Sequence, residues 1–407
     1  MALEVYRGGA KFDIDELKGH LATVLRLENV AVLLGAGASV SAGGLTVKAL
    51  WSGFVDGYPL SAAALQQFNF VDPTDVDPDV LVRTVPNIEK LGDSLEMAHI
   101  EWIRLKNTDP AVLLSLRTAI ADIKRSVFSA SLLKQDWWTD PSATQLAPEL
   151  FAHKNLLQKL TAARQPGQSS PWVFTTNYDL AIEWAAEAID LQVVNGFLGL
   201  HNRRFSPQSF DLGLRNTLAR GEARFGIYNI YLAKLHGSLT WTERFGEIYE
   251  RPASASYQDI QTFMQGGIEV AQAMVFPRAA KYMQTVGFVQ GELLRRFSEF
   301  LVRPQTTLLV AGYGFGDEHL NRILLSALQN PTLQVVVYLP ELKLDDVAQN
   351  ARAVQSLFGL CSPRITLVGG MPEAFFTSFV SHLPDPIVYD EQGQRIRDML
   401  KNQGVAS

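Results

Sequence analysis

Short runs of apolar residues recur along the chain, and several of them end in a loop of small or polar residues. Each run is four to six residues long, which suits a strand better than a helix. Continuous apolar runs of this kind are typical of parallel strands that are covered on both faces of a sheet. We therefore predict buried strands at residues 30–34, 172–176, 230–235, 306–311, 335–339 and 365–368.

The region between the first two runs has a different, helical period. Apolar residues recur there at spacings of three and four. The first stripe comprises Ile88, Leu91, Leu95, Ala98, Trp102 and Leu105, and the second comprises Leu113, Leu116, Ile120, Ile123 and Val127. Residues 107–110 supply a stop and a new start, so we expect an antiparallel helical hairpin. Both stripes could pack within one subunit, or part of them could form a contact between copies of the chain.

These patterns predict an α/β fold with a Rossmann-like parallel sheet, helices on both faces and a mainly helical insertion. Residues 244–267 read as polar and irregular, and the apolar residues 268–276 and a helix pattern at 287–301 follow them. The predicted units are a core of residues 1–60, 166–245 and 300–385, a helical insertion of 61–165, a smaller insertion or lid of 246–299, and a polar C-terminal tail of 386–407.

The first apolar run ends in Gly35-Ala36-Gly37-Ala38-Ser39. Glycines after a buried strand allow a diphosphate to approach the backbone, and a helix starting just beyond would point N–H groups at it. Val40 replaces the third glycine of the usual dinucleotide-binding pattern. Dinucleotide binding and a plain glycine-rich turn therefore both remain open for this segment.

The second run leads into Thr175-Thr176-Asn177-Tyr178-Asp179 and then into an amphipathic helix pattern. Asn177 thus lies at the carboxyl end of a strand, where open α/β sheets build their sites. Asn177 and Asp179 could instead only cap the following helix, which is a common role for both residue types.

The third run carries a histidine directly after its end, in Leu235-His236-Gly237-Ser238. A single histidine in such a place often has only a structural role. Of the seven histidines in the chain, however, only His236 follows an apolar run and precedes a Gly-Ser pair. We therefore single it out as a candidate catalytic residue.

The fourth segment, Gly312-Tyr313-Gly314-Phe315-Gly316-Asp317, joins the strand at 306–311 to a helix predicted at 318–328. Asp317 is placed to act as the N-cap of that helix. The three glycines leave space for a flat or charged ligand against the backbone.

In this order, the four segments resemble the active site of the sirtuin-like family, and the branch they resemble most is the bacterial antiphage NAD-degrading effector. The resemblance implies that Asn177 and His236 are catalytic, with Asn177 orienting ribose and water. It also implies that Asp179 faces the nicotinamide amide and that residues 312–317 hold the adenosine half of NAD+. The implied NAD+-binding residues are Gly35, Ala36, Gly37, Ala38, Ser39, Thr176, Asp179, Gly312, Tyr313, Gly314, Phe315 and Asp317.

Two departures from the deacetylating sirtuins concern acyl-lysine recognition. Those enzymes carry a structural zinc ribbon of four cysteines, whereas this chain has only Cys361, so we expect no zinc. Residues 43–48 also replace the Gly-Ile-Pro-Asp-Phe-Arg stretch of that family. NAD+ is then expected as the substrate of a glycohydrolase that yields nicotinamide and ADP-ribose. A non-catalytic NAD+ or ADP-ribose binding subunit and an NAD+-dependent protein deacylase are the alternatives.

The charge balance bears on partners and location. The formal net charge is −6 over 407 residues, without a run of Lys or Arg, which argues against nucleic acid as the principal ligand. We expect a cytoplasmic protein, because neither a membrane-spanning apolar stretch nor a signal peptide is evident.

Regulation is implied by the proposed activity, because an NADase that is always active would harm its own cell. We expect the sirtuin-like core to span nearly all of this sequence and to leave little of it for a sensor domain. The apolar stripes of the helical insertion suggest a homo-oligomer. The resemblance suggests a HerA-type hexameric ATPase as its partner, and a short Argonaute is a second possible partner. Antiphage defence by NAD+ depletion is the role it implies.

Overall fold

The computed structural model describes residues 3–71, 88–105, 109–133, 138, 146–165, 167–214, 217–218, 220, 229–266 and 285–385. The apolar segment 268–276 and the tail 386–407 lie outside the described residues. Within the described part of the chain, no helix is long and apolar enough to cross a membrane.

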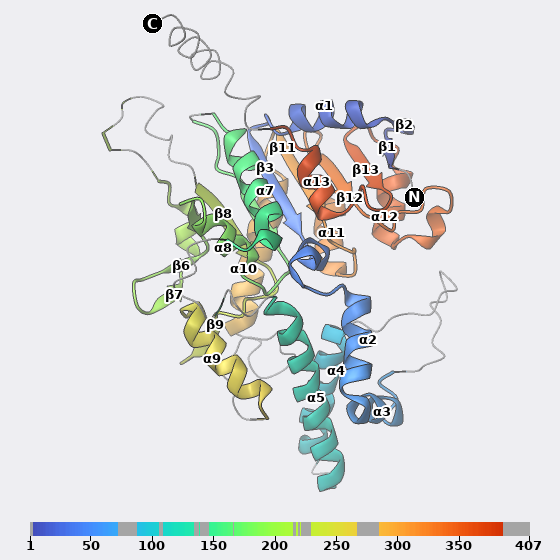
Figure 1. The fold of residues 1–407 in the computed structure, drawn as a ribbon, viewed down its shortest axis with the longest axis vertical. Helices are drawn as coiled ribbons and strands as arrows, with labels where there is room; N and C mark the ends of the chain where they lie inside the picture. The colour runs from blue at the N-terminus through green and yellow to red at the C-terminus, as the bar shows by residue number, and fades with distance from the viewer. Residues whose placement is uncertain are drawn as a thin grey trace, which may run out of the picture.

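A nine-stranded sheet forms the centre of the protein, in the order β2-β1-β13-β12-β11-β3-β4-β8-β5 (Figure 1). The parallel strands are β3 (Asn29–Leu34), β4 (Trp172–Thr175), β5 (Gln192–Val194), β8 (Asn229–Lys234), β11 (Thr306–Ala311), β12 (Gln334–Tyr338) and β13 (Ile365–Gly369). An antiparallel hairpin of β1 (Glu4–Arg7) and β2 (Ala10–Phe12) adds to one edge. The six strands predicted from apolar runs are confirmed, and so is the fold class.

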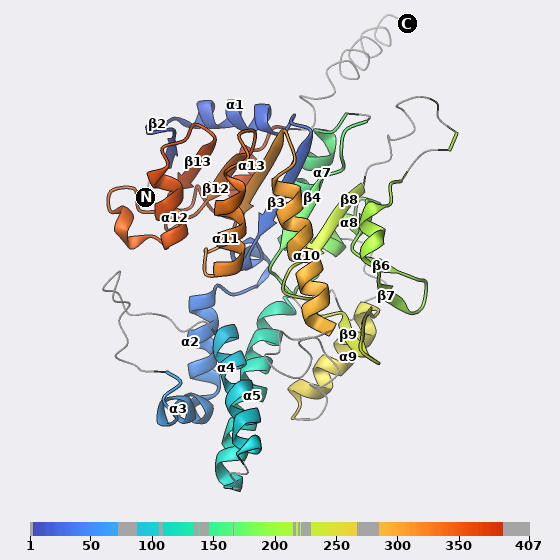
Figure 2. The same ribbon diagram turned by 180° about the vertical axis from the view of Figure 1, so that it is seen from behind.

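Alternate side chains of each strand belong to two different hydrophobic cores, one on each face of the sheet, because successive residues of a strand point to opposite faces. Leu33 and Leu308 pack with α10 (Thr285–Leu301), α11 (Glu318–Ala327) and α12 (Arg352–Gly359). Figure 2 shows these three helices on the near side of the sheet. Val32 and Leu309 pack with the helices of the other face. These are α1 (Ile14–Val24), α7 (Phe151–Ala162), α8 (Ala181–Glu187) and α13 (Phe376–His382). The sequence pattern grouped α7 with the helical insertion and most of α10 with the lid, but both helices pack against the sheet.

A helical unit extends from the carboxyl end of the sheet and comprises α2 (Val47–Gly57), α3 (Pro59–Gln67), α4 (Ile88–Arg104) and α5 (Pro110–Ser131) (Figure 1). The two predicted stripes meet there, because Leu91 and Leu95 of α4 share one core with Leu116 and Val127 of α5. The predicted pairing of these two helices is therefore confirmed. The same core includes Tyr178, Leu180 and Leu239, which follow β4 and β8.

The segment expected to be irregular at residues 244–267 is regular. It contains β10 (Glu247–Glu250), which pairs with β9 (Trp241–Arg244), and the helix α9 (Ala253–Met264). The hairpin turn is Phe245-Gly246, and both residues have positive φ, as a two-residue type I′ turn requires. A phenylalanine rarely takes this conformation, so the turn gave no clear signal. With β6 (Phe197–Leu198) and β7 (Arg203–Phe205), the hairpin forms a second, four-stranded sheet.

A buried histidine on α7 gives a testable pH dependence of stability. His153 is 1% exposed and lies against Phe376, and its Nδ1 has no hydrogen-bond partner among the described residues. Burial lowers the pKa of His153 to about 4, against the opposing charge of Asp179. The native state therefore keeps this ring neutral, whereas an unfolded chain takes up the proton near pH 6.5.

We predict that the free energy of unfolding falls as the pH drops from about 6.5 toward 4, by roughly 3 kcal/mol from His153 alone. Urea denaturation at a series of pH values measures this, with His153→Leu as the non-titrating comparison. His20 should leave a residual slope, because burial and Arg7 also lower its pKa to about 4. Equal pH dependence in the wild type and His153→Leu would show that His153 is not the source.

Candidate functional site

The four segments singled out in the sequence meet at one edge of the sheet. They follow β11, β3, β4 and β8, which are consecutive, parallel neighbours. Their carboxyl ends therefore lie side by side, and this is the edge where open α/β sheets bind ligands. We call the segments after β3, β4, β8 and β11 loops 1, 2, 3 and 4. Hydrogen bonds join loop 1 to loop 4, loop 1 to loop 2, and loop 3 to loop 4.

Loops 1 and 4 touch backbone to backbone. Gly37 N donates to Gly312 O at 2.9 Å. A Cβ added to Gly35 would lie 2.6 Å from Gly312 O, and one added to Gly312 would lie 2.2 Å from the nitrogen of Ala38. Gly312 also has φ +67°, in the left-handed region that favours glycine. The contact between these loops is thus sufficient to require these glycines, whether or not a ligand also approaches them.

Loop 1 continues as two 3₁₀ turns, Ala36–Ala38 (η1) and Val40–Ala42 (η2), where the sequence suggested the start of a longer helix. The N–H groups of Ala38 and Ser39 donate to Gly35 O and Ala36 O within the first turn. The side chain of Ala38 is buried in the core. Diphosphate binding by this loop stays a prediction.

Loops 1 and 2 are joined through side chains. Asn177 Nδ2 donates to Gly35 O at 3.1 Å and to Ser39 Oγ at 2.9 Å. Ser39 Oγ in turn donates to Asp179 Oδ2 at 2.6 Å. With both amide hydrogens engaged, Oδ1 is the acceptor that Asn177 can offer to a water molecule or a hydroxyl group. The side chain of Asn177 therefore binds loop 1, and the N-cap of α8 is Leu180 instead.

Asp179 bonds both to the start of α8 and to loop 1. Its Oδ1 accepts from Ala181 N, the first residue of α8, at 3.0 Å, although the N-cap of that helix is Leu180. Its Oδ2 accepts from Ser39 and so belongs to the hydrogen-bond chain that fixes Asn177. Thr176 lies at the same edge, where its N–H donates to Leu34 O at 3.0 Å. The contact of Asp179 with nicotinamide stays a prediction.

A buried lysine that the sequence analysis overlooked joins loop 2 to β8. Lys234 is 3% exposed, and its Nζ donates to Tyr178 O at 3.3 Å, to Asp179 O and to Glu183 Oε1 at 2.9 Å. Burial raises the pKa of Glu183, against the opposing effect of the Lys234 charge. The sequence did carry a signal for this buried lysine, because Lys234 is a charged residue inside an otherwise apolar run. Lys234 precedes His236 by two residues, and its hydrogen bonds fix the backbone of loop 2.

Loops 3 and 4 meet through a histidine–carboxylate pair. His236 Nε2 lies 2.9 Å from Asp317 Oδ2. Asp317 also caps α11 as predicted, because its Oδ1 accepts from His319 N at 2.8 Å and Leu320 N at 3.2 Å. Burial alone would raise the pKa of Asp317, but His236 and these N–H groups outweigh burial and lower it to about 2. The carboxylate is therefore charged at neutral pH.

The remaining residues of loop 4 divide into two classes. The side chains of Tyr313 and Phe315 are 6% and 4% exposed and belong to the core between the sheet and α11. A ligand contact from either residue would have to use the backbone. Gly314 and Gly316, by contrast, would place an added Cβ in open space. These two glycines are therefore the ones that leave room beside the loop.

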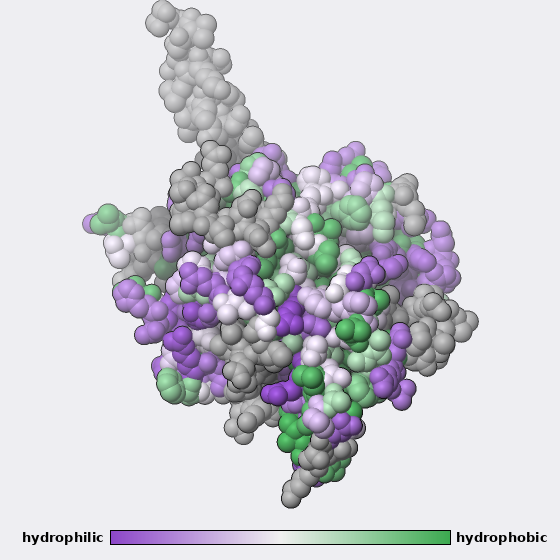
Figure 3. Space-filling view, turned by 60° about the horizontal axis from the view of Figure 1, so that its bottom comes forward, coloured by the Kyte–Doolittle hydropathy of each residue, from purple (hydrophilic) through white to green (hydrophobic). Residues whose placement is uncertain are grey.

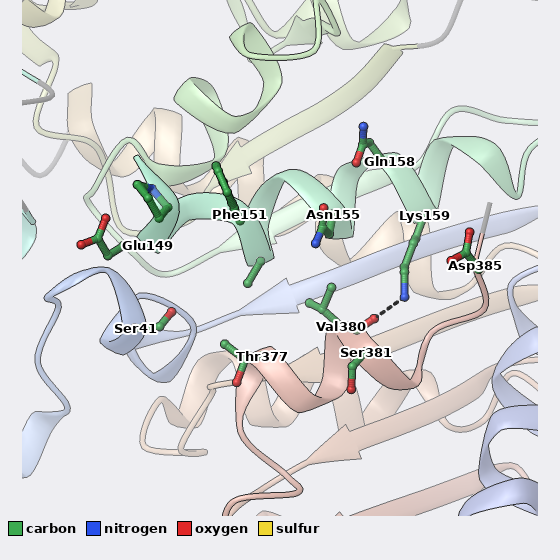
Figure 4. A pocket seen from close by; sticks show the side chains of 12 residues that line it. Ser41, Glu149, Phe151, Asn155, Gln158, Lys159, Thr377, Val380, Ser381 and Asp385 are labelled. Carbon is green, nitrogen blue, oxygen red and sulfur yellow. Dashed lines mark hydrogen bonds between the residues drawn. The ribbon is translucent and has the colours of Figure 1, made fainter. Parts of the chain in front are cut away.

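A cavity of 730 Å³ lies elsewhere, between η2, α7 and α13 (Figure 4). Its lining includes Ser41, Phe151, Asn155, Lys159 and Val380, and none of the site residues predicted from the sequence. Lys159 Nζ donates there to Val380 O at 2.8 Å and to Leu383 O at 2.7 Å, which satisfies carbonyls at the end of α13. Among the described residues, no three potential metal ligands cluster together.

We predict that Gly312→Ala destabilises the protein by more than about 3 kcal/mol, because it adds a backbone clash to an unfavourable φ. Gly314→Ala is the matched control in the same loop and should change stability by less than about 0.5 kcal/mol, since its Cβ meets no atom within 4 Å. Chemical denaturation of both variants measures the difference. Equal stability of the two would contradict the close packing of loops 1 and 4.

Comparison with known families agrees with this geometry. The family model of the SIR2-like domain matches residues 171–356, which include loops 2, 3 and 4. Loop 1 precedes the matched segment and joins it through the pairing of β3 with β4 and β11. No curated protein matches the chain. SIR2-like domains bind NAD+, so the match fits an NAD-related activity and supports a sirtuin-like family for this chain.

Proposed function

We propose that this protein is an NAD+ glycohydrolase that cleaves NAD+ to nicotinamide and ADP-ribose. The observation that carries the proposal is the placement of Asn177 and His236 after the adjacent strands β4 and β8, each fixed by a side-chain hydrogen bond. Both residues lie within the match to the SIR2-like domain. Gly314 and Gly316 leave space beside loop 4, which joins the same edge of the sheet.

Hydrolysis of NAD+ requires few functional groups from the protein. Nicotinamide in NAD+ is already a cationic leaving group, so its departure needs no general acid, in contrast to ordinary glycoside hydrolysis. The bond from ribose C1′ to the nicotinamide nitrogen breaks, and its electron pair neutralises the ring. Water then forms the new C–O bond at C1′ and gives up one proton. The protein must hold the ribose, exclude bulk water and orient that one nucleophile.

Two side chains supply these functions in our proposal. Asn177 Oδ1 accepts a hydrogen bond from the attacking water or from a ribose hydroxyl. His236 takes the proton that the water loses, which is a common role for a neutral imidazole and contributes typically 10²–10⁴ in rate. A deacylase would also need a surface for acyl-lysine, and the substitution at residues 43–48 and the single cysteine argue against it.

We predict that Asn177→Ala and His236→Ala each reduce NAD+ turnover at least about 10²-fold while the protein stays folded. The matched controls are Asn202→Ala and His201→Ala, which make the same changes at exposed positions between β6 and β7. Nicotinamide and ADP-ribose are measured by chromatography, and the melting temperature by calorimetry. Near-normal turnover in either site variant would refute the assigned mechanism, and a non-catalytic NAD+-binding subunit would show no turnover at all.

We further propose that the protein acts as a homo-oligomer with a HerA-type ATPase partner, in antiphage defence by NAD+ depletion. The far end of the helical unit supports an assembly role, because Ile103, Leu105 and Leu114 are 55–61% exposed. Figure 3 shows apolar side chains gathered toward this end. The core of the same unit includes Tyr178 of loop 2 and Leu239 beyond loop 3, so contacts made there could influence the site.

Light scattering after size exclusion should show an oligomer for the wild type and a smaller species for Ile103→Glu and Leu114→Glu, because a charge in an apolar contact is costly. Glu101→Lys changes an exposed charge on the same helix and serves as the control. A clean wild-type monomer at micromolar concentration would contradict self-assembly. Full NAD+ loss in infected cells that carry this protein without the ATPase would contradict the need for a partner.

A further inference from the structure

The contact between His236 and Asp317 joins loops that belong to non-adjacent strands. β8 and β11 are separated by β3 and β4, so loops 3 and 4 approach each other across the ends of two intervening strands. At a strand spacing of about 4.8 Å, this corresponds to roughly 14 Å along the sheet. The pair is therefore a tertiary contact across the candidate site, and not a consequence of neighbouring strands.

Hydrogen bonds other than the one to His236 fix the position of the Asp317 carboxylate. Oδ1 accepts two N–H groups at the start of α11, from His319 and Leu320. Oδ2 then lies 2.9 Å from His236 Nε2. Tyr313 steadies the same turn, because its hydroxyl donates to Asp317 O at 3.1 Å. An ionised carboxylate only accepts hydrogen bonds, so the proton of this contact must lie on Nε2.

We propose that Asp317 is a positioning residue for His236, which holds the neutral imidazole as its Nε2–H tautomer and so makes Nδ1 the nitrogen that accepts a proton. The inference rests on the NAD+ hydrolysis proposed above. When water loses a proton at C1′, Nδ1 takes it, and the resulting imidazolium is stabilised by its charge-assisted bond to Asp317. The proton on Nε2 stays where it is, and Asp317 remains ionised throughout.

A purely structural role of Asp317, as the cap of α11, leads to a different expectation. Asparagine caps helices about as well as aspartate, whereas alanine does not. If capping were the only role, Asp317→Asn would behave like the wild type. Asp317→Ala would lose about 1 kcal/mol of stability.

The positioning role predicts that Asp317→Asn keeps its melting temperature but loses activity. Asparagine can turn its NH₂ group toward His236, which favours the wrong tautomer, and comparable changes in hydrolytic triads reduce kcat by up to about 10⁴. We expect kcat to fall by 10²–10⁴ and KM to change less than about threefold. Wild-type kcat in Asp317→Asn, in a preparation whose wild type cleaves NAD+, would overturn the positioning role and leave the proposed function intact.

Long-range ¹H–¹⁵N spectra of ¹⁵N-histidine-labelled protein test the tautomer without relying on activity. His236→Ala identifies the signals of this residue among the seven histidines. The wild type should show the Nε2–H form at neutral pH, and Asp317→Asn should shift His236 toward the Nδ1–H form. A wild-type Nδ1–H tautomer, or an unchanged spectrum in Asp317→Asn, would refute the proposal. The expected spectra together with no NAD+ cleavage would instead count against the proposed function.

Discussion

The loop after β3 lies against the loop after β11 with no room between them for a single methyl group. The backbones of Gly35, Gly37 and Gly312 are in contact there. A Cβ added to Gly312 would lie 2.2 Å from the backbone nitrogen of Ala38. This contact fixes where loop 1 ends and where Ser39 lies. The other contacts follow from that placement, because Ser39 holds Asn177 and Asp179, while loop 4 carries Asp317 to His236.

The site is also notable for how many charges it keeps at low exposure. Asp179 and Lys234 are both less than 10% exposed, and each has partners that satisfy it. Lys234 is ion-paired with Glu183 at 2.9 Å, and removing one partner of a buried ion pair typically costs about 3–5 kcal/mol. These charges therefore favour one arrangement of loops 2 and 3 over alternatives. The helical unit packs against Tyr178 and Leu239, which follow β4 and β8, and so is joined to the candidate site.

The sequence was informative where one local pattern decided the outcome. Buried parallel strands read as continuous apolar runs, so the strands and the edge where their loops meet could be predicted. Asp317 was predicted as a helix cap, but its bond to His236 spans 81 positions and depends on the order of the strands. For the glycines of loop 1, the sequence left dinucleotide binding and a plain turn open, because the neighbour of these glycines in loop 4 is visible only in the fold. The β9–β10 hairpin was missed because Phe245 occupies a left-handed position that usually takes another residue type.

The most direct test of the central claim is a crystal structure of the His236→Ala protein with intact NAD+. We predict NAD+ at the carboxyl ends of β11, β3, β4 and β8, with its nicotinamide ribose within about 3 Å of Asn177 directly or through one water molecule. The adenosine half should lie along loop 4, beside Gly314 and Gly316. NAD+ bound instead in the cavity between α7 and α13, with its ribose away from Asn177, would contradict the proposed site.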